Sequence, residues 1–74
     1  MTRGAIETFY ADGRWRNRIH TVHELPQVHD TREEAAAVGR RLARSAGVDH
    51  IVRDTDGTIV QREPYDHDPH NLSE

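Results

Sequence analysis

Three alternating arginines give this sequence its clearest candidate for binding chemistry. Alternate residues of a strand point to the same face, so Arg14, Arg16 and Arg18 would form a stripe. With Phe9 beside it, the stripe could contact phosphates while the aromatic ring stacks on a base. A second interpretation is intramolecular, because Glu7 opposite Arg18 and Phe9 opposite Arg16 would engage two of the arginines in an ion pair and a cation–π contact.

Six histidines raise the question of a metal site. Five of them fall into two groups along the chain: His20, His23 and His29, and His67 and His70. Strand residues three apart point to opposite faces, so His20 and His23 cannot chelate together unless the chain turns between them. The second group resembles a histidine-rich tag, which collects divalent ions adventitiously. We expect no metal and no cofactor.

Catalysis finds little support in the residue types. There is no cysteine, and neither Ser45 nor Ser73 lies in a nucleophile elbow or beside an expected base. Asp54 and Asp56 fall in an expected turn, where carboxylates commonly accept hydrogen bonds from backbone amides. The five glycines are dispersed and form no phosphate-binding loop. We expect no enzymatic activity and no catalytic residues.

Chain length and net charge limit the other classes of protein to which this sequence could belong. A chain of 74 residues is close to the lower limit for an independent core, and without cysteine it cannot use disulfides or a thiolate zinc site. A net charge of −3 gives no global attraction to nucleic acid or anionic lipid. The sequence has neither a membrane-spanning apolar run nor the apolar stretch of a signal peptide at its start. We therefore expect a cytoplasmic protein that is not associated with a membrane.

Two β-prone runs, residues 5–10 and 14–22, are joined by Asp12-Gly13 and predict a hairpin. A two-residue turn there would place Tyr10 opposite Trp15 and Ile6 opposite Ile19. One face would then carry Ile6, Thr8, Tyr10, Trp15, Asn17 and Ile19. The other face would carry Glu7, Phe9, Arg16 and Arg18.

A helix is predicted after residues 24–29, which contain Pro26 and are expected to form a short edge strand or an extended connection. Thr31 and Glu34 have the spacing of a capping box, and Gly47 has the place of a C-terminal cap. The apolar stripe of this helix comprises Ala35, Val38, Leu42 and Ala46, with Gly39 and Ala43 beside it.

A second hairpin is predicted from residues 49–53 and 58–62. Its apolar residues come in adjacent pairs, and adjacent strand residues face opposite ways. With Ile51 and Ile59 turned toward the helix, Val52 and Val60 would lie in water with Phe9. We therefore expect Phe9, Val52 and Val60 to form the interface of a homodimer.

These elements predict an α+β fold, a two-layer sandwich in which one helix covers an antiparallel sheet of four to five strands. The expected order is β-β-(β)-α-β-β, in one small domain at residues 1–63 followed by a polar, proline-containing tail at residues 64–74. The expected centre of the core is Trp15, Ile6, Ile19, Leu42, Val38, Ile51 and Ile59. Trp15 is expected to be buried beneath the helix.

The sequence also resembles a known family along nearly its whole length. The resemblance rests on four features of the sequence: Asp12-Gly13 followed by Trp15, the helix capped by Thr31, the strand start Asp56-Gly57-Thr58-Ile59, and the ending Tyr65 with Asp68-Pro69. In these it is similar to domain-of-unknown-function family 2188, short proteins of actinobacteria and their phages. The resemblance implies the fold and no activity.

Two functions remain open from the sequence. The first is a non-catalytic binding or structural module that acts as a homodimer or binds a protein partner. The second is a small nucleic-acid-binding accessory protein that uses Phe9 and the stripe of Arg14, Arg16 and Arg18.

Overall fold

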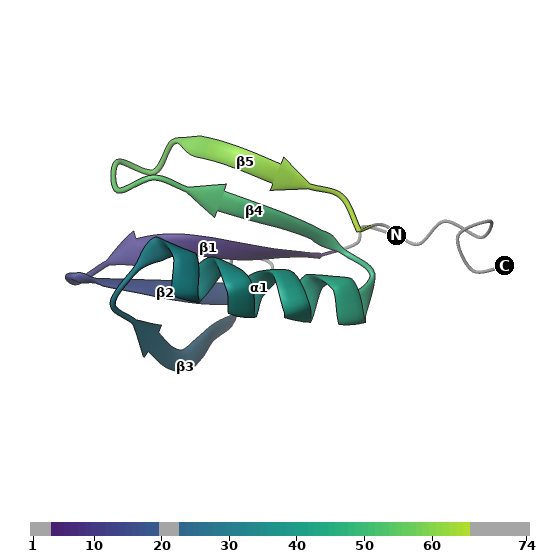
Figure 1. Cartoon of the computed structure of the whole chain (residues 1–74), viewed down its shortest axis with the longest axis horizontal. Helices are drawn as coiled ribbons and strands as arrows, with labels where there is room; N and C mark the ends of the chain where they lie inside the picture. Colours follow the sequence, from purple (N-terminus) through teal and green to yellow (C-terminus); the bar gives the residue numbers. More distant parts are fainter. Residues whose placement is uncertain (1–3, 20–22, 66–74) are drawn as a thin grey trace, which may run out of the picture.

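The computed structural model describes residues 4–19 and 23–65, which form one helix packed on a five-stranded sheet (Figure 1). The elements are β1 (Ala5–Ala11), β2 (Arg14–Ile19), β3 (His23–His29), α1 (Arg32–Ala46), β4 (Asp49–Arg53) and β5 (Ile59–Glu63). This confirms an α+β fold with a single helix, and residues 23–29 form the third strand. The end of the predicted strand at residues 20–22, with His20, and the tail at residues 66–74, with His67 and His70, lie outside the described residues.

The first hairpin has the predicted register. Ile6 lies opposite Ile19, and Tyr10 lies opposite Trp15. Asp12 and Gly13 both have positive φ, 55° and 77°, which is the backbone conformation that a tight two-residue hairpin turn requires.

The sheet is mixed, which corrects the expectation of a fully antiparallel sheet. Its spatial order is β3-β2-β1-β4-β5, and β1 pairs with β4 in parallel. The other three pairings are antiparallel. The chain leaves the edge strand β3, crosses the sheet as α1 and returns beside β1, and a helical crossover of this kind lets two strands run in parallel (Figure 1).

The helix begins and ends at the predicted caps. The Thr31 hydroxyl accepts a hydrogen bond from the Glu34 amide at 3.1 Å, and Gly47 is left-handed with φ 71°. The Gly47 amide donates to the Ala43 carbonyl at 2.8 Å, which closes the last turn. No helix in the described part of the chain is long and apolar enough to cross a membrane.

Small residues of α1 face the sheet, and one of them has no room for a side chain. The buried residues of the helix are Ala35, Ala36, Gly39 and Ala43. A Cβ atom on Gly39 would lie 2.6 Å from Asn17 Oδ1 and 2.8 Å from both His50 Nε2 and Thr8 Oγ1. The glycine therefore allows the helix backbone to approach three polar side chains of the sheet closely.

This approach changes the composition of the core. Ile6 is buried as predicted, but Ile19, Leu42 and Ile59 are 39%, 36% and 46% exposed. Trp15 and Val38 are only half-buried, so Trp15 is not fully buried beneath the helix as expected. The reason is that three fully buried polar side chains, Thr8, Asn17 and His50, occupy the centre of the interface. Larger apolar residues of the interface therefore lie at its margins.

The faces of β4, the first strand of the second hairpin, are the reverse of the predicted ones. Thr8 faces the helix and lies opposite Val52, so Val52 also faces the helix. Ile51 lies opposite Glu7, on the face that has no helix. The strand pattern with apolar residues on both faces is correct, but it could not indicate which member of each pair the helix covers.

The Gly39→Ala variant tests the close approach. Alanine favours a helix over glycine by about 1 kcal/mol, yet the new methyl group would overpack a buried site. We expect the overpacking to dominate, with a loss of about 1–3 kcal/mol in the free energy of unfolding measured by urea titration. The control is Ala37→Gly at an exposed position of α1, which should lose about 1 kcal/mol from helix propensity alone. A Gly39→Ala variant more stable than the wild type would contradict the close approach.

Shortening the chain tests the predicted domain boundary. We expect a chain that ends at Tyr65 to melt at nearly the temperature of the full chain, because residues 66–74 are almost all polar or proline. Differential scanning calorimetry on the two chains makes the comparison. A drop of several degrees would instead show that the tail contributes to folding.

Candidate functional site

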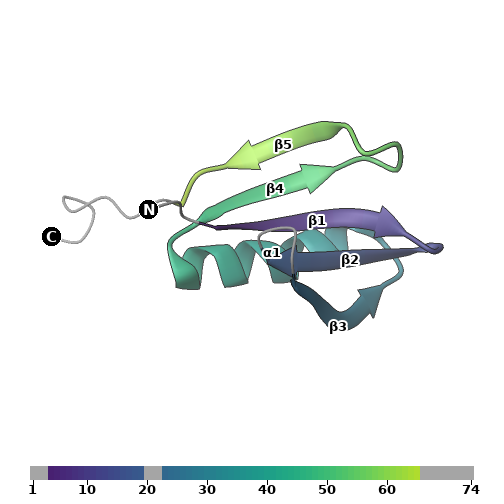
Figure 2. The ribbon, with the colours of Figure 1, turned by 180° about the vertical axis from the view of Figure 1, so that it is seen from behind.

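The predicted arginine stripe lies on the face of the sheet that no helix covers (Figure 2). Every member of the stripe has an acidic neighbour: Arg14 pairs with Asp30 at 3.4 Å, Arg16 with Glu24 at 3.9 Å and Arg18 with Glu7 at 2.7 Å. The positive charge of the stripe is therefore largely balanced within the domain.

Phe9, the aromatic residue beside the stripe, also has a partner within the domain. The Arg18 guanidinium lies 4.3 Å above the Phe9 ring, which is only 7% exposed. The cation–π contact expected of Arg16 is thus made by Arg18, while Arg16 Nε donates to the Ala11 carbonyl at 3.3 Å. With its ring covered and its charges paired, this face does not favour the nucleic-acid interpretation.

Glu7 organises the open face. The residue is 4% exposed, and its carboxylate lies 2.7 Å from Arg18 and 3.4 Å from Arg53. The Arg18 side chain lies over Phe9, and Ile51, on the same face, is 7% exposed. On the second face of the sheet, the domain's own arginines therefore cover Phe9 and pair with Glu7, where the sequence suggested a partner.

This arrangement removes the basis of the predicted dimer interface. Phe9 lies under Arg18, and Val52 faces the helix and is 3% exposed. Val60 is 50% exposed, but it lines a groove beside α1. The structure thus separates Phe9 from Val52 and Val60, which line the same groove, and the expectation that Phe9 and Val52 are left in water is wrong.

A chain of buried polar contacts lies beneath the helix. Asn17 Nδ2 donates to the Ala35 carbonyl at 2.9 Å, and Thr8 Oγ1 lies 2.6 Å from Asn17 Oδ1. Thr8 Oγ1 also lies 2.8 Å from His50 Nε2. The chain therefore connects the helix backbone to β2, β1 and β4 in turn.

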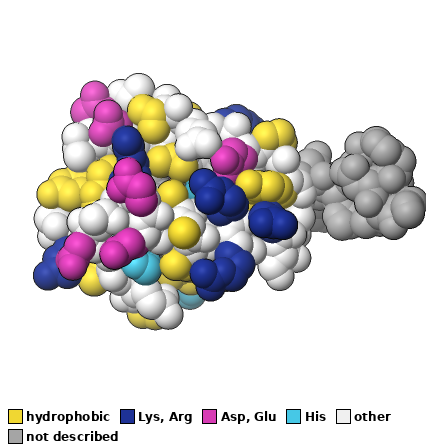
Figure 3. All heavy atoms as spheres, viewed as in Figure 1, with side chains coloured by type: hydrophobic (Ala, Val, Ile, Leu, Met, Phe, Trp, Pro, Cys, Tyr) yellow, Lys and Arg dark blue, Asp and Glu magenta, His cyan; other side chains and the backbone are white. Residues whose placement is uncertain are grey.

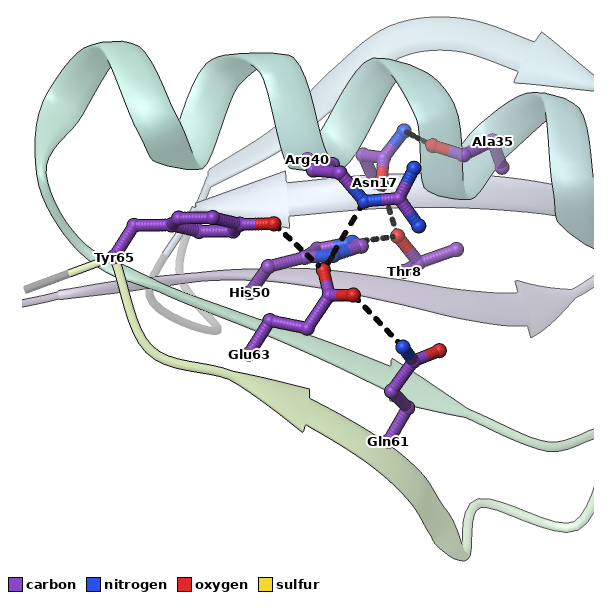
Figure 4. A network of polar contacts seen from close by, with 8 residues as sticks. All are labelled: Thr8, Asn17, Ala35, Arg40, His50, Gln61, Glu63 and Tyr65. Carbon is purple, nitrogen blue, oxygen red and sulfur yellow. Dashed lines mark hydrogen bonds and ion pairs between the residues drawn. The ribbon is translucent and has the colours of Figure 1, made fainter.

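Glu63 at the end of β5 completes this chain (Figure 4). Its Oε1 lies 3.3 Å from His50 Nδ1 and accepts hydrogen bonds from Arg40 Nε at 3.1 Å and from the Tyr65 hydroxyl at 3.0 Å. Its Oε2 accepts a hydrogen bond from Gln61 Nε2 at 2.8 Å. We call the eight residues of Figure 4 the polar network: Thr8, Asn17, Ala35, Arg40, His50, Gln61, Glu63 and Tyr65.

The network changes the acidity of its members. Burial is the largest influence on the pKa of His50 and lowers it, against the hydrogen bond and the charge of Glu63. Burial would raise the pKa of Glu63, but the contact with His50 and the hydrogen bonds from Arg40 and Tyr65 outweigh it and keep this pKa below its ordinary value. The pKa of Arg40 is raised, first by its hydrogen bond to Glu63. The fold therefore favours a neutral His50 and an ionised Glu63.

Two hollows flank the helix. A groove of about 580 Å³ separates α1 from β5 and is lined by both polar and apolar side chains, among them Arg40, Gln61 and Val60. An apolar groove of about 410 Å³ lies at the other side, between the C-terminal half of α1 and the sheet. Its lining includes no charged residue among the described ones, and its larger side chains are Ile6, Ile19, Leu25, Leu42 and Val48.

Charge is distributed unevenly over the helix side. Acidic side chains gather toward the beginning of α1 and basic side chains toward its end, with hydrophobic atoms at the surface between and around them (Figure 3). No cluster of three or more metal-ligating side chains occurs within residues 4–19 and 23–65.

Sequence reasoning missed the polar network, although part of its signal was present. The predicted register already placed Thr8 opposite Asn17 in the middle of an otherwise apolar face. Buried polar groups need hydrogen-bond partners, so such a pair indicates further polar residues nearby. A glycine on the facing side of the helix, Gly39, was the matching signal for a close approach. Nothing local in the sequence pointed to His50 or Glu63.

Comparisons with known proteins give a family and no activity. The model of a family described as "Uncharacterized protein conserved in bacteria (DUF2188)" matches residues 6–65. No curated protein and no solved structure matches the chain.

The network predicts how stability depends on pH. Because the folded-state pKa of His50 lies below its ordinary value of about 6.5, the unfolded chain takes up this proton first on acidification. We therefore expect the free energy of unfolding, measured in urea, to fall as pH decreases below about 6.5. The lowered pKa of Glu63 adds a further loss below about 4.3, with the same sign.

The control for this prediction is His50→Gln, which removes the titrating ring but keeps an amide that can donate to Thr8. Its stability should change less than that of the wild type between about pH 7 and pH 5. Equal pH dependence in the two proteins would show that His50 does not contribute.

Proposed function

This chain belongs to the DUF2188 family of uncharacterised bacterial proteins, and we propose that it is a non-catalytic binding module that acts as a homodimer. The supporting observation is the small share of its apolar side chains that the fold buries. Six large apolar side chains of the described residues are 36% to 50% exposed: Tyr10, Ile19, Val28, Leu42, Ile59 and Val60. Only four large ones are buried: Ile6, Phe9, Ile51 and Val52.

We place the interface at the apolar groove rather than at the open face. Ile19 and Leu42 border this groove, and burying their exposed apolar surface would contribute a favourable free energy of association. The central part of a protein interface is typically depleted of charge and its rim is polar. A second copy fits these conditions, since two-fold contact would bury the same apolar patch on both subunits.

The engagement of the polar network supports a non-catalytic role. Glu63 accepts hydrogen bonds from three donors and also lies 3.3 Å from His50, and His50 is itself completely buried. A general acid or base must reach a substrate proton, and these groups face each other instead. We further propose that the protein acts in the cytoplasm and that another protein is a second partner.

Sedimentation equilibrium tests the homodimer and its location together. We expect the wild type to approach dimer mass in the high micromolar range and Leu42→Glu to remain a monomer, because a carboxylate would be buried at the interface. Leucine and glutamate have similar helix propensities, and Leu42 is on the surface of the subunit, so this variant should fold.

Val60→Glu is the matched control, because Val60 is similarly exposed but lines the groove on the β5 side. It should associate as the wild type does. A wild type of monomer mass at every concentration would refute the homodimer. Dissociation by Val60→Glu and not by Leu42→Glu would move the interface to the β5 side.

A further inference from the structure

The directions of the buried hydrogen bonds are fixed from the helix end of the polar network. Asn17 Nδ2 donates to the Ala35 carbonyl at 2.9 Å, which turns the amide oxygen of Asn17 toward Thr8. An amide oxygen can only accept, so the Thr8 hydroxyl donates across the 2.6 Å contact. Thr8 has then used its single hydrogen.

The tautomer of His50 follows from this direction. Thr8 Oγ1 has only acceptor capacity left, so His50 Nε2, 2.8 Å away, must carry a hydrogen and donate it. A neutral imidazole has one N–H, which leaves Nδ1 bare. Nδ1 then directs a lone pair at Glu63 Oε1, 3.3 Å away.

A count of hydrogens shows what the network lacks. Three successive contacts join Asn17 to Thr8, Thr8 to His50 and His50 to Glu63, and each needs one hydrogen. Thr8 and a neutral His50 supply two, whereas a doubly protonated His50 supplies the third. The contact without a hydrogen is the longest of the three, at 3.3 Å.

We propose that His50 Nδ1 and Glu63 Oε1 form a buried proton-binding site whose occupancy controls how firmly the end of β5 is attached to the domain. With the proton absent, Glu63 is held by Arg40, Tyr65 and Gln61 alone. With the proton present, Nδ1 donates to Oε1 and an ion pair joins β5 to β4.

The groups around the ring set the range in which the proton binds. Glu63 on β5 favours the proton, Arg40 on α1 opposes it, and burial opposes it most. Thr8 on β1 and Asn17 on β2 are neutral, and Tyr65 donates to Glu63 rather than to the ring. Because burial prevails, the site fills on the acidic side of the ordinary histidine range.

The effect of the proton on the attachment of β5 can be measured, because the coupling between the proton and Glu63 is reciprocal. If Glu63 strengthens proton binding by His50, the proton strengthens the contact with Glu63 by the same factor. The pKa of His50 with and without the Glu63 charge therefore reports how far protonation tightens β5.

Imidazole nitrogen NMR on the full chain tests the proposal, because the ¹⁵N shifts of the ring distinguish the two neutral tautomers and follow the titration. At neutral pH we expect the neutral His50 ring to carry its hydrogen on Nε2. In Glu63→Gln we expect the same tautomer and a lower His50 pKa than in the wild type. The control is Glu24→Gln, which removes a carboxylate from β3 at the opposite edge of the sheet and should leave the His50 pKa unchanged.

Two results would overturn the site. A neutral ring protonated at Nδ1 in the wild type contradicts the hydrogen count, and this measurement stands even where Glu63→Gln fails to fold. A His50 pKa in folded Glu63→Gln equal to that in Glu24→Gln shows that the proton and Glu63 are not coupled.

Discussion

The close approach of α1 to the sheet at Gly39 is the constraint on which the rest of this structure depends. It places a hydroxyl, an amide and an imidazole, from Thr8, Asn17 and His50, in the centre of the only helix–sheet interface of the described residues. Buried polar groups are tolerated only when they are hydrogen-bonded. Their bonds extend to the helix backbone at one end and to Glu63 at the other, so one set of contacts positions both the helix and the edge strand β5.

The cost of this arrangement is a small apolar core. The helix faces the sheet with alanines and a glycine, and an alanine buries much less apolar surface than the leucine or valine expected there. Val38 is half-buried and Leu42 is exposed, because both lie beside the line of closest approach rather than on it. The polar centre and the exposed apolar residues at its margin therefore have one cause, and a surface suited to association follows from it.

Local rules were sufficient for the parts of the fold that local chemistry decides. The turn at Asp12-Gly13 sets the register of the first hairpin, and the caps at Thr31 and Gly47 set the bounds of the helix. Pairing of β1 with β4 depends on where a crossover returns, which no local pattern encodes. The position at which the crossover returns also decides that Val52 faces the helix and Ile51 does not. The arginine stripe was placed correctly, but its interpretation depended on whether acidic side chains reach it, and Glu24 and Asp30 come from β3 and the loop after it.

The two faces of the sheet bury their central side chains in opposite ways. On the helix side, polar side chains occupy the centre and apolar ones the margin. On the open side, the Arg18 guanidinium covers Phe9, and the buried carboxylate of Glu7 holds both Arg18 and Arg53. The titrating ring of His50 lies on the other face, between α1 and β5. The proton-binding site and the apolar groove therefore share the helix side of the sheet, whereas the open face is held by the ion pairs of Glu7.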